Sequence, residues 1–369
     1  MITKDNIIRI RLNNQLLNDA HIESAAQVVD TLVAVQAQDY YGATWAISQR
    51  ISHPVVFAKI EDDFNKGAFL RTHLLRPTWH FVSPKDIRWM LALTGPRVHA
   101  QNAFMYRKSE LDRPIFNKAN QVIIHALENE EFLTRAQLGS VLEQSGIDTH
   151  TGQRLTYLIM AAELDGIICS GPRQAKQFTY ALLDKRVPEK ETLSYDDALV
   201  ELSTRYFATR GPATIQDFSK WSGLNLSECR KGHEAIKANL TCEIFEQSEY
   251  WYRRSDHNAH EATAQARLVS IYDEFFSSYK NQLAAGSADK TKFLKSLGNA
   301  LTSVVLVDGQ IAGTWKREMG KDSVAIRTML LNEPDELQKS MIYSAALKFG
   351  RFIEKEIRLQ VEQFEILKS

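Results

Sequence analysis

A helix-start signature that occurs twice constrains this chain more than any other feature. Thr134 with Gln137, and Thr214 with Asp217, have the spacing of a capping box, in which two side chains satisfy backbone donors in the first turn of a helix. A helix-patterned segment precedes each signature. Another helix and two strand-like runs around a turn follow it. The chain therefore contains a degenerate repeat whose unit has three helices and a hairpin.

Three helices followed by a hairpin is the element order of a winged helix, and a third copy begins the chain. Helix patterns within residues 5–22, 24–37 and 43–64 precede strand-like runs in residues 67–82. In the two later copies, further helices are expected at 120–128, 154–164, 198–207 and 227–239, and hairpins at 166–182 and 241–253. We therefore predict three winged-helix units in tandem.

The last third of the chain has a different pattern. Two alternating strands between Val304 and Trp315 are joined at Asp308-Gly309, the strongest short hairpin signal in the sequence. A further strand is expected at 323–330 and mostly helix at 333–365, after a linker at 255–260. The predicted fold class is α+β and mainly helical.

The helix pattern that starts after Ser24, its expected N-cap, carries an apolar stripe that ends in a glutamine. Ala25, Val29 and Leu32 recur at helical spacing, and Gln36 is the next member. Gln38 would point away from Gln36 on a continuing helix, so the two amides converge only where the helix ends near Ala37. A second helix start is expected at residues 83–86, with Ser83 as N-cap, Pro84 at the first helical position and Asp86 completing a capping box.

Charge is balanced overall but not locally. The formal net charge is zero, whereas residues 66–113 hold nine Lys and Arg against three acids. Such a segment favours a basic face for nucleic acid, and an ordinary solvated surface explains it equally well. Three widely spaced cysteines, no signal-peptide pattern at the N-terminus and no apolar run of membrane-spanning length favour a reducing cytoplasm.

Several kinds of chemistry have no support in the sequence. No His, Cys or acid cluster has metal-ligand spacing, and no glycine-rich phosphate loop or nucleophile elbow occurs. We therefore expect no metal site, no nucleotide cofactor and no serine hydrolase chemistry.

Three short motifs resemble those of a known family. Val35-Gln-Ala-Gln-Asp39, Arg76-Pro-Thr-Trp-His80 and Asp86-Ile-Arg-Trp89 are similar to the signature of the AlkZ and YcaQ superfamily of bacterial tandem winged-helix DNA glycosylases. The Gln-apolar-Gln form points to the AlkZ-like branch. Pro77 departs from the family, which usually has Gly there. Gly211 to Thr214 with Trp221, and Leu306 to Trp315, resemble the third winged helix and the C-terminal β-barrel of the family, and Ser270 to Tyr279 matches its Pro-x-Phe-Asp-Glu segment in part.

The resemblance implies a concave DNA-binding surface made by three winged-helix units at 1–115, 116–190 and 191–257, and a β-barrel-like unit with a terminal helix at 258–369. It also implies hydrolysis of the N-glycosidic bond of bulky or crosslinked N7-alkylguanine and other N-alkylpurines, by a monomer acting on double-stranded DNA without a cofactor. Gln36 and Gln38 would be catalytic. The expected DNA contacts are Arg71, His73, Arg76, Thr78 and His80 in the hairpin, and Arg173 and Lys176 in the loop at 171–177.

The residue types alone leave other interpretations open. Gln36 and Gln38 are also ordinary polar residues for a helix end, and Asp39 is either a base or a C-terminal turn residue. A histidine within a strand is more often structural than functional. Because the winged helix is mostly a binding module, a DNA-binding regulator without chemistry is the alternative function.

Overall fold

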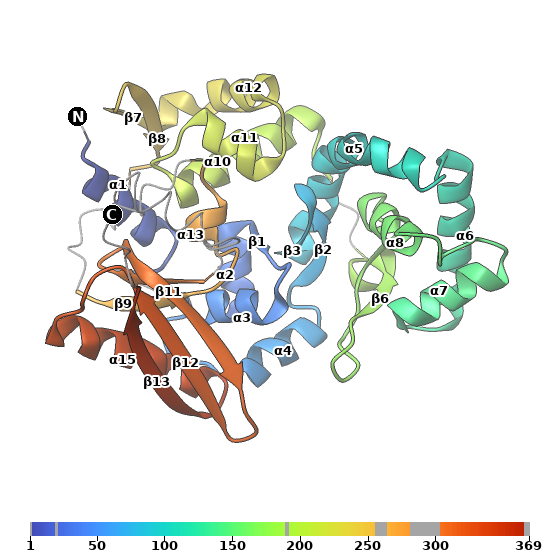
Figure 1. The fold of residues 1–369 in the computed structure, drawn as a ribbon. Coiled ribbons are helices and arrows are strands. Elements are labelled where there is room, and N and C mark those ends of the chain that lie inside the picture. The colour runs from blue at the N-terminus through green and yellow to red at the C-terminus, as the bar shows by residue number, and fades with distance from the viewer. Residues whose placement is uncertain (1, 19–20, 189–191, 255–263, 281–302, 365–369) are drawn as a thin grey trace.

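The computed structural model describes residues 2–18, 21–188, 192–254, 264–280 and 303–364 (Figure 1). The linker expected at 255–260 lies outside the described residues. The hairpin β2–β3 and its neighbour β1 occupy the middle of the molecule, with α10–α12 above them in Figure 1, α5–α8 to the right, and a sheet with α15 at the lower left.

The helices and strands of the described residues are, in chain order, α1 (Lys4–Asn14), α2 (Ala25–Leu32), β1 (Ala34–Gln36), α3 (Tyr40–Ser48), α4 (Phe57–Asn65), β2 (Leu70–Leu74), β3 (Arg76–Val82), α5 (Pro84–Lys108), α6 (Arg113–Asn129), β4 (Leu133–Thr134), α7 (Arg135–Gln144), α8 (Arg154–Leu164), β5 (Ile168–Ser170), β6 (Thr179–Leu182), α9 (Leu183–Arg186), α10 (Tyr195–Arg210), α11 (Ile215–Ser222), α12 (Leu226–Ile236), η1 (Lys237–Asn239), β7 (Thr241–Phe245), β8 (Ser248–Tyr252), β9 (Ala266–Val269), α13 (Glu274–Ser277), β10 (Val304–Val307), β11 (Gln310–Met319), β12 (Ser323–Leu330), α15 (Glu336–Phe352) and β13 (Glu356–Gln363).

The signals with a defined local chemistry predicted their elements correctly. Both capping boxes form, at the start of α7 through Thr134 and Gln137 and at the start of α11 through Thr214 and Asp217. The expected hairpins appear as β5 with β6, β7 with β8, and β10 with β11 around Asp308 and Gly309. Capping side chains made the helix starts predictable, and turn residues between strand-like runs made the hairpins predictable.

The helix predicted to reach Gln36 ends earlier, and this prediction was wrong. α2 stops at Leu32, Val33 has a φ of 67°, and residues 34–36 form strand β1 instead. β1 pairs with β3 in a three-stranded sheet of order β1-β3-β2, with Gln36 opposite His80. Gln36 is therefore held by a sheet rather than by a helix end.

The capping box expected at Ser83 is also absent. Pro84 does begin α5, but the Ser83 side chain makes no capping hydrogen bond. The Asp86 carboxylate instead accepts a hydrogen bond from Trp89 Nε1 at 3.0 Å and pairs with Arg205 at 2.8 Å. The Asp86 side chain therefore pairs with Arg205 of α10 instead of capping the start of α5.

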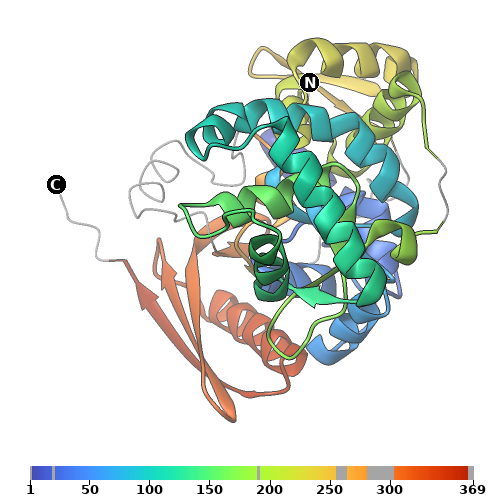
Figure 2. The ribbon, with the colours of Figure 1, turned by 90° about the vertical axis from the view of Figure 1, so that its right-hand side faces the viewer.

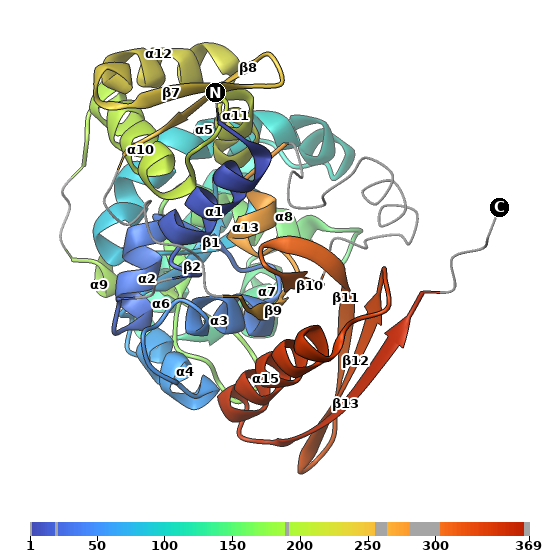
Figure 3. The same cartoon turned by 90° about the vertical axis from the view of Figure 1, so that its left-hand side faces the viewer.

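The C-terminal unit is an open sheet and not a barrel. Its five strands have the order β13-β12-β11-β10-β9, so the two end strands are not paired with each other. α15 lies across one face of the sheet (Figure 3). The helix expected over 333–365 ends at Phe352, and residues 356–363 form β13, parallel to β12.

The apolar cores join distant parts of the chain. One core packs Val29 and Trp45 against Trp315 and Phe349 of the C-terminal sheet and α15, and another packs the hairpin against α5, α10 and α11. The third core lies among α5–α8, which face the viewer in Figure 2. The N-terminal segment that carries Gln36 is therefore packed against the C-terminal sheet and α15, and the hairpin against α5, α10 and α11.

Candidate active site around Gln36

The residues of the central hairpin divide between its two faces. Strand pairing sets Gln36 opposite His80, and alternate residues of a strand share a face. Arg76, Thr78 and His80 thus lie on the same side of β3 as Gln36. Arg71 and His73 of β2 face the other way, where His73 pairs with Trp79.

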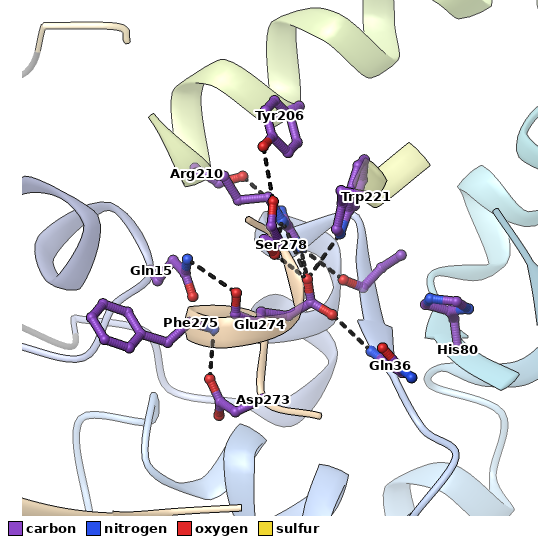
Figure 4. A network of polar contacts seen from close by, with 12 residues as sticks. Gln15, Gln36, His80, Tyr206, Arg210, Trp221, Asp273, Glu274, Phe275 and Ser278 are labelled. Atoms are coloured by element: carbon purple, nitrogen blue, oxygen red, sulfur yellow. Dashed lines mark hydrogen bonds and ion pairs between the residues drawn. The ribbon is translucent and has the colours of Figure 1, made fainter. Parts of the chain in front are cut away.

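A buried carboxylate lies directly behind Gln36 (Figure 4). Gln36 N donates to Glu274 Oε1 at 2.9 Å. The other carboxylate oxygen accepts from Arg210 Nη2 at 2.8 Å, Trp221 Nε1 at 2.9 Å and Ser278 Oγ at 2.7 Å. One side chain thus connects β1 with α10, α11 and α13.

Glu274 is ionised at neutral pH. Burial alone raises the pKa of its carboxyl group, but the Arg210 guanidinium and the hydrogen bonds from Arg210, Gln36 and Ser278 outweigh burial and hold this pKa at about 2. The Glu274 and Arg210 side chains are both fully buried. Glu274 is therefore a fixed negative charge and not a proton donor.

Arg76 holds the side chain of Gln36 from the opposite direction. Its Nη2 donates to Gln36 Oε1 at 3.1 Å and lies 3.4 Å from His80 Nε2. Its Nη1 donates to the backbone oxygen of Trp221 and, at 3.4 Å, to that of Lys220, at the C-terminal end of α11. A cation at this end of a helix is favoured because the last carbonyl groups there lack helical partners.

His80 is a neutral acceptor. Burial is the largest cause that lowers the pKa of His80 to about 3, and the positive charge of the Arg76 guanidinium is the second. Its Nδ1 lies 3.0 Å from the backbone oxygen of Thr78, which can only accept a hydrogen bond, so Nδ1 carries the proton. Nε2 is then unprotonated and accepts from Arg76.

Gln38 and Asp39 follow β1 in a bend. Gln38 is exposed. Asp39 caps the start of α3, because its Oδ1 accepts from Gly42 N at 3.2 Å, and its Oδ2 lies 3.8 Å from Arg317. It is thus an N-cap of the next helix, and not a residue of a C-terminal turn.

The comparisons with known proteins agree on one family. The family model described as "DNA glycosylase AlkZ-like" matches residues 29–352. The chain belongs to the AlkZ-like DNA glycosylases. A curated relative, the "Interstrand DNA cross-link repair glycosylase" of Streptomyces sahachiroi, is 23% identical over 333 residues, which cover 83% of this chain and 85% of the relative.

A solved structure shares the fold of this AlkZ-like glycosylase. The Streptomyces sahachiroi DNA glycosylase AlkZ superposes with a TM-score of 0.80, over 97% of this chain and 100% of that chain, at 18% sequence identity. The α+β architecture of the described residues is therefore that of an AlkZ-like glycosylase.

On the opposite face of the hairpin, Arg71 and His73 are buried and make contacts within the protein. Arg71 is 6% exposed, stacks between Trp79 and Phe178, and donates to the backbone oxygen of Ala37 at 3.1 Å. Burial lowers the pKa of Arg71 to about 10. His73 is 4% exposed and pairs with the buried carboxylate of Glu163 on α8. Both side chains are thus buried and engaged within the protein, and the DNA contacts expected for them from sequence stay predictions.

The two expected DNA contacts in the loop at 171–177, Arg173 and Lys176, differ in how exposed their side chains are. The Arg173 guanidinium pairs with Glu61 at 2.8 Å and lies over Tyr40 at 4.7 Å, and its side chain is almost fully buried. Lys176 is exposed. Of these two expected DNA contacts, Lys176 is thus the one that solvent reaches.

Residue patterns did not identify the carboxylate behind Gln36. Glu274, Arg210, Trp221 and Ser278 meet Gln36 only in three dimensions. The available signal was the partial match of residues 270–279 to the family, and likewise that of Gly211 to Trp221. No group of metal-ligating side chains occurs among the described residues, and none of the described helices is long and apolar enough to cross a membrane.

Proposed function

We propose that this AlkZ-like glycosylase hydrolyses the N-glycosidic bond of N-alkylated purines in duplex DNA, N7-alkylguanine in particular, and that Gln36 and Gln38 hold the attacking water. The observation that carries the proposal is that neither Glu274 nor His80, which lie beside Gln36, is a proton donor at neutral pH. Glu274 is a buried anion with a pKa of about 2, and His80 is neutral with a pKa of about 3. Neither group can protonate a departing base at neutral pH.

Such a site suits a base that needs no protonation. Guanine alkylated at N7 is already cationic and departs as a neutral molecule, whereas an unmodified purine departs as an anion unless it gains a proton. The site then has to orient a water and tolerate positive charge on the sugar, which neutral amides and a nearby fixed carboxylate allow. Specificity for damaged bases would follow because neither Glu274 nor His80 can protonate an unmodified base as it departs.

The backbone beyond β1 supports a joint role for the two glutamines. Ala37 N donates to the backbone oxygen of Trp79 at 2.7 Å, so the pairing with β3 continues past Gln36. Gln38 is the next residue and lies in the bend that follows β1. We propose that this bend brings the Gln38 amide to the same water as the Gln36 amide.

For the DNA, we propose three winged-helix units at 1–115, 116–190 and 191–257, each contributing helices and one of the small sheets β1-β3-β2, β4-β6-β5 and β7-β8. Lys176, which is exposed, is the proposed contact that DNA reaches directly. The contacts expected at Thr78 and His80 stay predictions, because His80 is fully buried and the Thr78 hydroxyl, which has no partner among the described residues, is buried too. We further propose that the protein acts as a monomer in the cytoplasm.

The test is incubation of the protein with a duplex that contains a single N7-methylguanine, followed by detection of abasic sites. We expect base release by the wild-type protein and a reduction of about 10²-fold in the single-turnover rate for Gln38→Ala, with unchanged melting temperature and DNA affinity. A crosslinked duplex, the substrate class in the name of the Streptomyces relative, forms a second arm. Binding without any base release would instead identify a DNA-binding protein without chemistry.

A further inference from the structure

We propose that Arg76 is a positioning residue that turns the Gln36 carboxamide so that its NH2 group faces the substrate, which leaves Gln38 as the acceptor for the attacking water. This inference rests on the proposed function and assigns different roles to the two glutamines. It also replaces the phosphate contact that the sequence predicted for Arg76.

The first step concerns which end of the Gln36 amide meets Arg76. A guanidinium has five N–H donors and no acceptor, so the amide atom that faces it has to be the carbonyl oxygen. The contact between Arg76 Nη2 and Gln36 Oε1 at 3.1 Å therefore fixes the orientation of the amide independently of how its two ends are assigned. No described residue accepts a hydrogen bond from the Gln36 amide nitrogen. That NH2 group remains as a donor.

The second step concerns how firmly Arg76 is held. One edge of its guanidinium donates to the last carbonyls of α11, and the other edge contacts Gln36 and the unprotonated Nε2 of His80. Gly223, with a φ of 73°, allows this approach, because a Cβ there would lie 2.1 Å from the backbone oxygen of Leu75 at the hairpin tip. Arg76 is thus fixed by groups on two elements and is not an extended surface side chain.

The third step concerns the backbone of Gln36. Its N–H is held by Glu274 while its side-chain oxygen is held by Arg76. With both ends fixed, the NH2 group has a defined direction. Gln38 is exposed, and no described residue donates to its side-chain carbonyl oxygen, so it is the residue able to accept from a water.

The experiment compares acidic replacements of the two glutamines in single-turnover excision from N7-methylguanine duplex. A glutamate retains acceptor oxygens but loses the NH2 donor. We expect Gln38→Glu to be at least about tenfold faster than Gln38→Ala, and Gln36→Glu to be no faster than Gln36→Ala. If Gln36→Glu instead restores most of the rate lost in Gln36→Ala, Gln36 acts as an acceptor and the inference fails.

Arg76→Ala separates positioning from phosphate binding. We expect the rate at saturating protein to fall by about 10²-fold, with little change in the slope of log affinity against log salt. A lost phosphate contact would instead flatten that slope by about 0.9 and leave the saturated rate unchanged, which would overturn the inference. The matched control is Thr94→Val, which removes the hydroxyl that accepts from Leu75 N at 3.3 Å and so loosens the hairpin tip without touching Gln36.

Two further outcomes are distinguishable. Should Arg76→Ala not fold, the two glutamate variants decide the question by themselves. Failure of the wild-type protein to release any base would overturn the proposed function and this inference together. Excision by the wild type at a rate equal to that of Arg76→Ala would overturn this inference alone.

Discussion

At the scale of single residues, Glu274 and Arg210 depend on each other. Both side chains are fully buried, and their ion pair spans 2.8 Å. Removing one charge of such a pair leaves the other without compensation in the interior, which typically costs about 3–5 kcal/mol. The pair therefore stabilises the fold chiefly because neither member can be removed alone.

We expect Glu274→Gln to destabilise the protein by about that amount, because Arg210 then lacks its counter-charge. Thermal or urea unfolding measures the change. Ser278→Ala is the matched control, since it removes the hydrogen bond from Ser278 Oγ to the same carboxylate at 2.7 Å and the acceptor for Arg210 Nε at 3.1 Å, but keeps both charges. Its expected cost is about 1 kcal/mol. Equal losses in the two variants would contradict the importance of the charge.

The pKa values at the site predict a rate that is independent of pH from about 7 to 9. His80, with a pKa of about 3, and Glu274, with a pKa of about 2, titrate far below this range. Single-turnover excision across the range checks the prediction. A rate that changes about tenfold per pH unit near pH 7 would show that a group titrating there transfers a proton, and would contradict the prediction.

The same two groups predict sensitivity of the fold to acid. Each pKa is lower in the folded chain than its ordinary value, 6.5 for His80 and 4.5 for Glu274. Their stabilisation is therefore complete above about pH 6.5 and about pH 4.5 respectively, and it is lost as pH falls toward 3 and 2. We expect the melting temperature to fall below about pH 6.5, less steeply in His80→Gln. Identical acid profiles for the variant and the wild type would contradict this account.

At the scale of elements, the end of α11 and the tip of the hairpin fit closely at one glycine. Gly223 ends α11 in the left-handed conformation, and the backbone oxygen of Leu75 leaves no room for a Cβ. Gly152 also has a positive φ, of 60°, but has no atom within 4 Å of a Cβ. Comparing alanine at these two positions therefore separates the cost of the steric contact with Leu75 from the cost of a positive φ.

We expect Gly223→Ala to lower stability by several kcal/mol and Gly152→Ala by about 1 kcal/mol, because the second substitution carries the strain of a positive φ alone. Gly223→Ala should also slow excision, since the hairpin tip that carries Arg76 has to move. Melting temperature and single-turnover rate measure the two effects. Similar losses in both variants would mean that the contact with Leu75 relaxes freely.

Elements were predictable where a signal was local. The alternation of Ile357, Leu359 and Val361 was a strand signal within the segment that we predicted as helix, and β13 follows it. The stripe of Ala25, Val29 and Leu32 was correct for α2, but nothing local marked the break at Val33. A β-branched residue with a φ of 67° is unusual, and here the pairing of β1 with β3 determines it.

The site was predictable only in part, for the same reason. Gln36 and Gln38 were found through a motif, whereas Glu274 meets Gln36 across 238 residues of sequence. No periodicity encodes a contact of that kind. Likewise, the basic composition of the hairpin could not distinguish Arg76, which faces Gln36, from Arg71, which is buried on the opposite face.

At the scale of the whole molecule, residues in the last part of the chain pair with and pack against residues of the earlier parts. Arg50 on the loop after α3 pairs with Asp273 at 2.7 Å, and Arg210 pairs with Glu274. The core around Trp45 includes Trp315 and Phe349. Arg50 and Arg210 thus lie before the predicted boundary at residue 257, whereas their partners Asp273 and Glu274 lie after it.

We expect a chain truncated after residue 257 not to unfold cooperatively, because it lacks the carboxylates for Arg50 and Arg210 and a large share of its apolar core. Circular dichroism during heating provides the measurement. A sharp transition within a few degrees of the full-length protein would show that the first three predicted units fold independently.

The position of Arg76 between two elements has a consequence for communication within the protein. Its guanidinium is planar and rigid, with one edge on the carbonyls of α11 and the other on the amide of Gln36. A shift of α11 relative to the hairpin would move that plane and, with it, the amide. Substitutions at the end of α11 would thereby alter the geometry at Gln36 without contacting Gln36 itself.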